Sequence, residues 1–255
     1  MADALIGRGF VGGNLHRQGS FQELYHSSNI ETIQGRSLDL VVCAGAPGAK
    51  WLANKEPGKD LESLQALMSN LASVRARRFV LISTVDVYPR PDGVDEDATI
   101  DMEAATPYGR HRFMLEEFVR NRFESTVIRL PGLFGDGLKK NVIYDLLHDH
   151  QVDRICAESA FQFYDIANLW KDIRVAMEHR LGLVNFATEP TTVLEVARAG
   201  FGLELDALAR KDAVRYDFRT KHAAVFGGSD GYICSKRQVL TSLKLFVERS
   251  RRGSG

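Results

Sequence analysis

The stretch that decides the fold lies at the start of the chain and reads Ala4-Leu5-Ile6-Gly7-Arg8-Gly9-Phe10-Val11-Gly12-Gly13. An apolar run leads without a gap into a G-x-G-x-x-G pattern. Glycines in this pattern allow a tight turn, a close approach of backbone to a pyrophosphate, and close packing of a helix on a strand. The stretch therefore predicts a strand, a dinucleotide-binding turn and a helix over residues 14–18; the alternative is a glycine-rich turn without a ligand. The predicted cofactor contacts are Gly7, Arg8, Gly9, Phe10, Val11 and Gly12.

Short apolar runs alternate with amphipathic stretches through the first half of the chain. The expected strands are residues 4–6, 21–25, 38–44, 79–83 and 125–130. Apolar residues at helical spacing predict a helix over residues 60–74, and Thr106 and Pro107 are suited to the N-cap and the first position of another. Such alternation predicts an α/β protein with a Rossmann-like, doubly wound parallel sheet.

The pattern loosens beyond Gly135. Residues 141–148 and 169–179 are expected to be helical, residues 161–165 to form a strand, and Thr192 with Glu195 to form a capping box. We find no linker or repeat, so we expect a small C-terminal substrate lobe packed on the core. The predicted division is a dinucleotide-binding core over residues 1–135, a lobe with elements returning to the core over 136–250, and a disordered tail over 251–255.

Composition limits the classes of function. The chain has 255 residues, of which 44% are hydrophobic and 26% charged, and its 33 basic and 33 acidic residues balance. These values exclude a disordered chain and offer no electrostatic footprint for nucleic acid or an anionic membrane. Three scattered cysteines and the lack of a leader or spanning segment predict a cytoplasmic protein. His148 and His150 lack companion ligands, so no metal site is expected.

The choice of dinucleotide depends on the segment after the second predicted strand. An NAD site would carry Asp or Glu there, about 20 residues beyond the glycine turn. The chain has His26-Ser27-Ser28-Asn29 instead, and Arg8 could pair with a 2′-phosphate. This slightly favours NADP over NAD, although serines also serve NAD sites. Ser27 and Ser28, together with Ala44, Gly45 and Ser83 at the ends of later strands, complete the predicted cofactor contacts.

Two further segments carry candidate catalytic groups. Ser83-Thr84-Val85-Asp86-Val87-Tyr88 ends the fourth predicted strand, and Pro107-Tyr108-Gly109-Arg110-His111-Arg112 opens the next helix. Tyr108 and Arg112 share one helix face, and a guanidinium beside a phenol favours the phenolate. A Ser or Thr hydroxyl across the cleft could hold a substrate oxygen. Packing is the other interpretation of such a tyrosine.

The chain resembles the extended short-chain dehydrogenase/reductases, the NAD(P)-dependent epimerase/dehydratase group. The order and spacing of the matching segments agree from about residue 4 to about residue 200. The resemblance is carried by Gly9-Phe10-Val11-Gly12, Ser83-Thr84-Val85-Asp86-Val87-Tyr88, Pro107-Tyr108-Gly109, Val127-Ile128-Arg129-Leu130-Pro131-Gly132-Leu133-Phe134-Gly135, the segment over residues 161–169 and the turn over residues 184–192.

The resemblance implies roles for individual residues. Tyr108 would be the acid/base, Arg112 would stand where the family has the lysine that lowers the tyrosine pKa and holds the nicotinamide ribose, and Thr84 would bond the reacting oxygen. Ser83 would face the nicotinamide. Asp86, Tyr88 and Asn141 are weaker candidates for contact with substrate. Only Asp86 remains of the acidic pair that family dehydratases carry, which weakens the dehydratase interpretation.

The resemblance implies an NAD(P)-dependent oxidoreductase or epimerase that transfers hydride at a carbinol or carbonyl carbon, and it favours a nucleotide-linked sugar as the substrate. By analogy the protein would be a homodimer with a small-molecule substrate. The alternative is a non-catalytic NAD(P)-binding regulatory or scaffold protein of the same fold, which Arg112 in place of lysine keeps open.

Overall fold

The structure is a computed structural model that describes residues 1–205 and 213–252. By its internal contacts the chain forms two compact units. The first comprises residues 1–89, 97–130 and 169–184, and the second comprises residues 90–96, 131–168 and the remainder from 185. The predicted boundary at residue 135, between a dinucleotide-binding core and a substrate lobe, stays a prediction.

A six-stranded sheet in the order β2-β1-β3-β4-β5-β9 organises the first unit. The pairs from β2 to β5 are parallel. The strand order changes direction between β1 and β3, so the loops that follow these two strands border the switch point where α/β sheets bind ligands. The predicted doubly wound fold is confirmed. Its strands are β1 (Asp3–Ile6), β2 (Glu23–Tyr25), β3 (Ser37–Cys43), β4 (Arg75–Thr84), β5 (Ser125–Leu130) and β9 (Leu183–Asn185).

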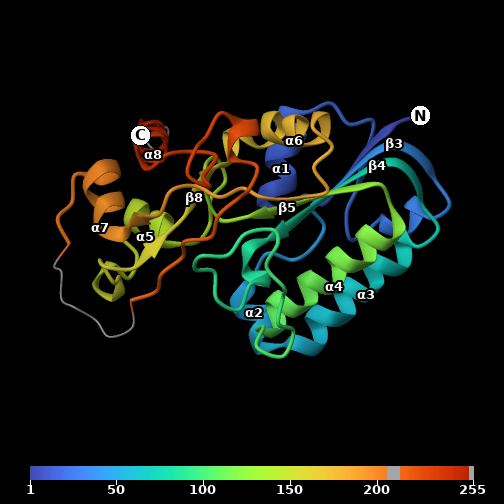
Figure 1. The fold of residues 1–255 in the computed structure, drawn as a ribbon, viewed down its shortest axis with the longest axis horizontal. Coiled ribbons are helices and arrows are strands. Elements are labelled where there is room, and N and C mark those ends of the chain that lie inside the picture. The colour runs from blue at the N-terminus through green and yellow to red at the C-terminus, as the bar shows by residue number, and fades with distance from the viewer. Residues whose placement is uncertain (206–212, 253–255) are drawn as a thin grey trace. The chain divides into compact units, whose positions relative to one another are not determined.

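Helices cover both faces of this sheet (Figure 1). On one face lie α3 (Pro57–Leu71) and α4 (Pro107–Arg122), and on the other lie α1 (Phe10–Gln18) and α6 (Leu169–Glu178). The apolar stripes of α3 and α4 pack on alternate strand residues to form one buried core. The short helix α2 (Lys50–Lys55) precedes α3, which begins three residues before its predicted start.

The start of α4 follows the prediction closely. Thr106 is the N-cap and accepts a hydrogen bond from the N–H of Gly109 at 3.3 Å, while Pro107 takes the first helical position. The N-cap hydroxyl satisfies one of the N–H groups that a helix start leaves without an intrahelical partner. Tyr108 is thereby held in the first turn of the helix.

The second unit contains two small sheets and several helices. A parallel pair joins β6 (Gly132–Phe134) to β8 (Phe163–Asp165), and an antiparallel pair joins β7 (Ala160–Phe161) to β10 (Thr191–Thr192). Its core lies among helices α5 (Val142–His148), α7 (Val193–Val196) and α8 (Lys236–Arg252) and the π-helix Ala197–Phe201. The predicted capping box of Thr192 and Glu195 is present.

Two predictions for this unit need correction. The strand expected over residues 161–165 is divided at Gln162, because the two halves belong to different sheets: β7 pairs with β10 and β8 pairs with β6. The side-chain amide of Gln162 bonds the backbone of Phe218 and Thr188. Arg251 and Arg252, expected in a disordered tail, are the last residues of α8. Residues 253–255 of that tail lie outside the described residues.

Candidate functional site

The glycine turn has the geometry that its sequence predicts. Gly7 has a φ of +105°, and a Cβ there would lie 2.3 Å from the carbonyl oxygen of Ala44. A Cβ on Gly12 would lie 2.1 Å from the carbonyl oxygen of Gly7, so α1 packs against the turn at a distance that only glycine permits. A Cβ on Gly9, the N-cap of α1, would meet no atom within 4 Å. The turn is therefore tightly packed at Gly12, whereas the space beside Gly9 is open.

The loop after β3 borders this turn. Gly45 lies beside Ile6, where a Cβ would come within 3.0 Å of a side-chain methyl group. The N–H of Ala44 donates to the carbonyl of Ile6 at 2.8 Å. The predicted contacts Ala44 and Gly45 are therefore placed next to Gly7, at the carboxyl ends of adjacent parallel strands.

A crevice of about 220 Å³ separates α1 from the edge strand β2. Arg8, His16 and Arg17 line it with the glycines of the turn, and no carboxylate is among its lining residues. Ser27 and Ser28 follow β2 and are exposed. The nearby carboxylate of Glu23 is engaged by Tyr25 and Arg36, and these partners hold its pKa below the usual value despite partial burial. Sequence analysis did not identify His16 and Arg17, whose place on α1 becomes informative only once β2 is located.

Tyr108 and Thr84 meet at the carboxyl end of β4. Thr84 is the last residue of β4, and its side chain is a hydrogen-bond partner of the buried Tyr108. The backbone N–H of Tyr108 donates to Oδ1 of Asn54 on α2 at 3.0 Å. The structure thus brings together the phenol and the hydroxyl that the sequence placed in separate segments.

Arg112 is fixed in a buried ion pair that the sequence did not predict. Its Nη1 and Nη2 atoms donate to the two carboxylate oxygens of Asp60 at 2.7 and 2.9 Å, and Nη2 also donates to the carbonyl of Pro47. The guanidinium carbon lies 4.4 Å from the centre of the Tyr108 ring. Asp60 precedes Leu64, Leu67 and Leu71 at helical spacing, so its position on the buried face of α3 was the available signal.

Arg112 acts on the pKa of the Tyr108 hydroxyl in the expected direction, but its effect is outweighed. Burial raises the pKa of the Tyr108 hydroxyl above its ordinary value and Asp86 adds to this, whereas Arg112, the hydrogen bond with Thr84 and Lys50 act in the opposite direction. The favourable charge of Arg112 does not outweigh the loss of solvent around the phenol. The net effect on the pKa of the Tyr108 hydroxyl is therefore to raise it, whereas the sequence pattern favoured a lowered pKa.

Asp86 lies beside these groups, in the 3₁₀ turn η2 (Val85–Val87). Its carboxylate forms an ion pair with Nζ of Lys50 on α2 at 2.8 Å, and its backbone N–H donates to the hydroxyl of Thr84 at 3.2 Å. Together with the bond from Tyr108 to Asn54, the ion pair attaches α2 to the site at two points. Lys50 and Asn54 were not identified from the sequence.

Ser83 and Tyr88 belong to a second buried network. The hydroxyl of Ser83 donates a hydrogen bond to the carboxylate of Glu116. The same carboxylate accepts hydrogen bonds from Nε and Nη2 of Arg129 at 3.0 and 2.6 Å. Nη1 of Arg129 donates to the hydroxyl of Tyr88 at 2.7 Å. Tyr88 is only 3% exposed, and its hydroxyl is turned to this arginine. Its expected contact with substrate stays a prediction. Glu116 follows Tyr108 and Arg112 at intervals of four residues, a polar stripe that the sequence displayed and we did not use.

Asn141 lies in the second unit and is committed to local structure. Its Oδ1 accepts the N–H groups of Ile143 and Tyr144 at 3.0 and 3.2 Å, and its Nδ2 donates to the carbonyl of Leu133 at 2.8 Å. These bonds hold its backbone at a φ of 111° and start α5. The expected contact of Asn141 with substrate stays a prediction.

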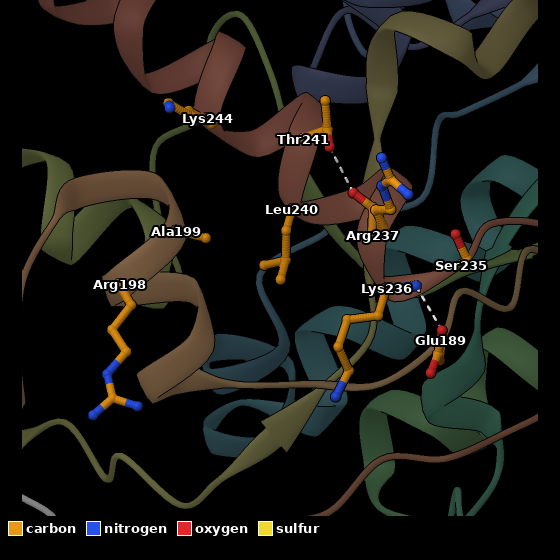
Figure 2. Close-up of a pocket in the computed structure, with 9 residues that line it drawn as sticks. All are labelled: Glu189, Arg198, Ala199, Ser235, Lys236, Arg237, Leu240, Thr241 and Lys244. Atoms are coloured by element: carbon orange, nitrogen blue, oxygen red, sulfur yellow. Dashed lines mark hydrogen bonds between the residues drawn. The ribbon is translucent and has the colours of Figure 1, made fainter.

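A larger, open pocket of about 770 Å³ lies in the second unit. Figure 2 shows the side chains that line it. Two of its basic side chains are already in ion pairs, Lys236 with Glu195 at 2.9 Å and Arg198 with Glu204 at 2.7 Å. The backbone N–H of Lys236 donates to Glu189, which also lines the cavity. None of the predicted site residues lines it, and we assign it no part in the chemistry.

Within residues 1–205 and 213–252, no group of three or more His, Cys, Asp or Glu side chains is placed to hold a metal ion. No helix of that same part of the chain is long and apolar enough to cross a membrane.

The model of the NAD dependent epimerase/dehydratase family matches residues 7–165. The fold is similar to that of MoeE5 in complex with UDP-glucose and NAD, with 17% identity, a TM-score of 0.73 and 100% of both chains covered. A search among curated proteins finds no match.

Two further solved structures share the fold. UDP-glucose 4-epimerase of the hyperthermophilic eubacterium Thermotoga maritima, with UDP-glucose, has 17% identity and a TM-score of 0.74, with 100% of both chains covered. RMD from Pseudomonas aeruginosa, complexed with NADPH, has 16% identity and a TM-score of 0.72, with 98% of this chain and 100% of that chain covered. At these identities the likeness shows the fold alone.

Proposed function

Because the chain belongs to the NAD dependent epimerase/dehydratase family, we propose that it is an NAD(P)-dependent oxidoreductase or epimerase that acts on a carbinol or carbonyl carbon of a nucleotide-linked sugar. One observation carries this proposal. The glycine turn after β1 and the pair of Tyr108 and Thr84 at the end of β4 lie at the same edge of one parallel sheet. That edge is where such sheets bind ligands.

The residues present fit a dinucleotide. The N-cap of α1 is Gly9, which offers no side-chain cap to the first N–H groups of the helix, and the space above it is open. Those N–H groups and the helix dipole suit a pyrophosphate. Nε of Arg112 is buried and has no hydrogen-bond partner among the described residues. A ribose hydroxyl of a bound cofactor would supply an acceptor for it.

The chemistry then divides between cofactor and chain. A bound nicotinamide would supply or accept the hydride. Thr84 would donate a hydrogen bond to the reacting oxygen of the substrate, and Tyr108 would exchange a proton with that oxygen. Asn54, through the backbone N–H of Tyr108, and Arg112, over its ring, would hold the phenol in place.

We propose NADP(H) as the preferred cofactor. Arg8, Arg17 and His16 surround a crevice beside the end of β2, the place where an acidic residue would hold the ribose hydroxyls of NAD. Arg8 has an exposed side chain in the turn itself. The carboxylate of Glu23 is engaged with Arg36, so its repulsion of a 2′-phosphate is reduced.

A nucleoside diphosphate sugar is the proposed substrate class. The support comes from the relatives, since MoeE5 and the Thermotoga maritima epimerase were solved with UDP-glucose. The competing function is a dinucleotide-binding module without turnover. It is favoured by the commitment of both terminal nitrogens of Arg112 to Asp60 and Pro47.

The test combines binding and turnover. NADPH and NADH are titrated calorimetrically into the purified chain, which is then incubated with UDP-sugars and their 4-keto derivatives while cofactor absorbance and sugar products are followed. We expect NADPH to bind and at least one sugar to be converted. Failure of both dinucleotides to bind refutes the proposal, and binding without conversion of any sugar supports the module.

A further inference from the structure

Asp60 holds Arg112 in the candidate active site. It lies in the first turn of α3, with a side chain only 4% exposed. Its carboxylate accepts two hydrogen bonds from Arg112 and a third from Nδ1 of His111 at 2.8 Å. Burial raises the pKa of Asp60, but the bonds from Arg112 and His111 more than offset this and hold it below its usual value. The carboxylate is therefore ionised.

The ion pair determines where the guanidinium of Arg112 lies. With Nη1 and Nη2 held by Asp60 and Pro47, the group is fixed above the ring of Tyr108, not beside its hydroxyl. The positive charge of Arg112 is balanced within hydrogen-bond distance by the carboxylate. A balanced pair acts on a nearby phenol much more weakly than a lone cation at the same distance.

We propose that Asp60 is a positioning residue: it fixes Arg112 on the face of Tyr108 and weakens the effect of the Arg112 charge on the Tyr108 hydroxyl, which favours donation of the hydroxyl proton during the reduction of a carbonyl group. This inference rests on the proposed function for its reaction, but its electrostatic part concerns the chain alone.

The other charged groups around Tyr108 also form a balanced set. Lys50 on α2 and Asp86 in η2 form an ion pair, and Thr84 at the end of β4 bonds the phenol. His111 on α4 is bonded to Asp60 and not to Tyr108. Arg112 and Lys50 each act to lower the pKa of Tyr108, but burial outweighs them and the pKa is raised.

A bound reduced nicotinamide would supply a hydride to the carbonyl carbon. The Tyr108 hydroxyl would give its proton to the carbonyl oxygen, which gains negative charge in the reduction. The products are an alcohol, the oxidised dinucleotide and a tyrosinate, which takes a proton from solvent. Starting from a neutral phenol, reduction needs no prior loss of a proton, whereas oxidation of an alcohol would.

The experiment measures the ionisation of Tyr108 directly. Because the chain has seven tyrosines, NMR of tyrosine labelled at the hydroxyl-bearing ring carbon is recorded against pH, and Tyr108→Phe assigns the signal. In the wild type we expect a midpoint above the free-tyrosine value of about 10. A midpoint below that value overturns the proposal.

Asp60→Asn removes the carboxylate that balances the charge of Arg112. It should lower the midpoint of the Tyr108 titration by about one pH unit. If this variant does not fold, the double variant Asp60→Asn with Arg112→Lys keeps a cation without its carboxylate and should show the same direction of shift. Asp39→Asn is the matched control, since it removes the carboxylate from an exposed, two-point pair with Arg77; it should leave the midpoint unchanged. An unchanged midpoint in a folded variant without the Asp60 carboxylate overturns the proposal.

The titration separates this inference from the proposed function. If no dinucleotide binds, the proposed function fails while the shift in midpoint still decides the role of Asp60. Where turnover is found, the rate of reduction in Asp60→Asn should begin to fall at lower pH than in the wild type. A purely structural role would change stability and leave both pH profiles in place.

Discussion

Gly109 lies so close to Asp86 that a Cβ on Gly109 would come 2.1 Å from the backbone carbonyl oxygen of Asp86. The first turn of α4 therefore rests directly on the turn that follows β4. Tyr108 precedes Gly109 and Thr84 ends β4, so this contact sets the separation of the two groups proposed to handle the substrate oxygen.

Replacement of Gly109 tests this contact. In a helix, alanine is ordinarily favoured over glycine by about 1 kcal/mol, but Gly109→Ala should lower the melting temperature because the added methyl group meets the Asp86 carbonyl. Displacement of Tyr108 should also lower turnover by up to about a hundredfold. Gly58→Ala in α3, where a Cβ meets no atom within 4 Å, is the control and should cost neither stability nor activity.

The glycine turn should separate binding from folding. Gly9→Val places its side chain in open space and should give a folded protein that no longer binds dinucleotide, because that space is needed by the pyrophosphate. Gly12→Ala should instead destabilise the fold, since its Cβ would lie 2.1 Å from the Gly7 carbonyl. Thermal denaturation and calorimetric titration distinguish the two outcomes. Undiminished dinucleotide affinity in Gly9→Val would remove the turn from the binding site.

The preference for NADP(H) depends on charge at the end of β2. Arg8→Ala should weaken binding of NADPH and leave that of NADH unchanged, because only the former carries a 2′-phosphate. Ser28→Asp should reverse the order of affinities by adding a carboxylate that repels the phosphate and bonds the ribose hydroxyls. Calorimetric titration of both cofactors measures the two ratios. Tighter binding of NADH by the wild type would show that the preference is wrong.

Local sequence was enough to predict what local geometry determines. The glycine turn, the cap at Thr106 and the capping box at Thr192 depend on neighbours close in sequence, and all are found. The five strands predicted for the parallel sheet are found as well, but its sixth strand, β9, was not predicted. The strand break at Gln162 was missed because the two halves pair with different strands that are distant in sequence, β10 and β6.

The electrostatics of the site could not be predicted in the same way. Asp60 lies 52 residues from Arg112, and without the fold nothing pairs them. Sequence spacing correctly placed Arg112 near Tyr108 but could not show that burial would dominate the pKa of the phenol. The partners of Ser83 and Tyr88 were hidden for the same reason, since Arg129 reaches Tyr88 across neighbouring strand ends.

The buried pair of Glu116 and Arg129 should be sensitive to the loss of one partner. Both side chains are at most 2% exposed, so Glu116→Gln or Arg129→Met leaves an uncompensated charge or donor and should lower the free energy of unfolding by about 3–5 kcal/mol. The exposed pair of Asp39 and Arg77 is the control. Asp39→Asn should change the free energy of unfolding by at most about 1 kcal/mol. Denaturant unfolding measures both. Equal small losses would mean that the network does not brace Ser83 and Tyr88.

The most direct test of the account is the effect of Tyr108→Phe on turnover and on cofactor affinity measured in the same preparation. The substitution removes only the hydroxyl that is proposed to exchange a proton with the substrate oxygen. With a sugar that the wild type converts, we predict a loss of turnover of about 10²–10⁴-fold, while calorimetric titration gives the wild-type affinity for NADPH. Turnover retained in Tyr108→Phe would contradict the account, because the proton would then be moved by another group.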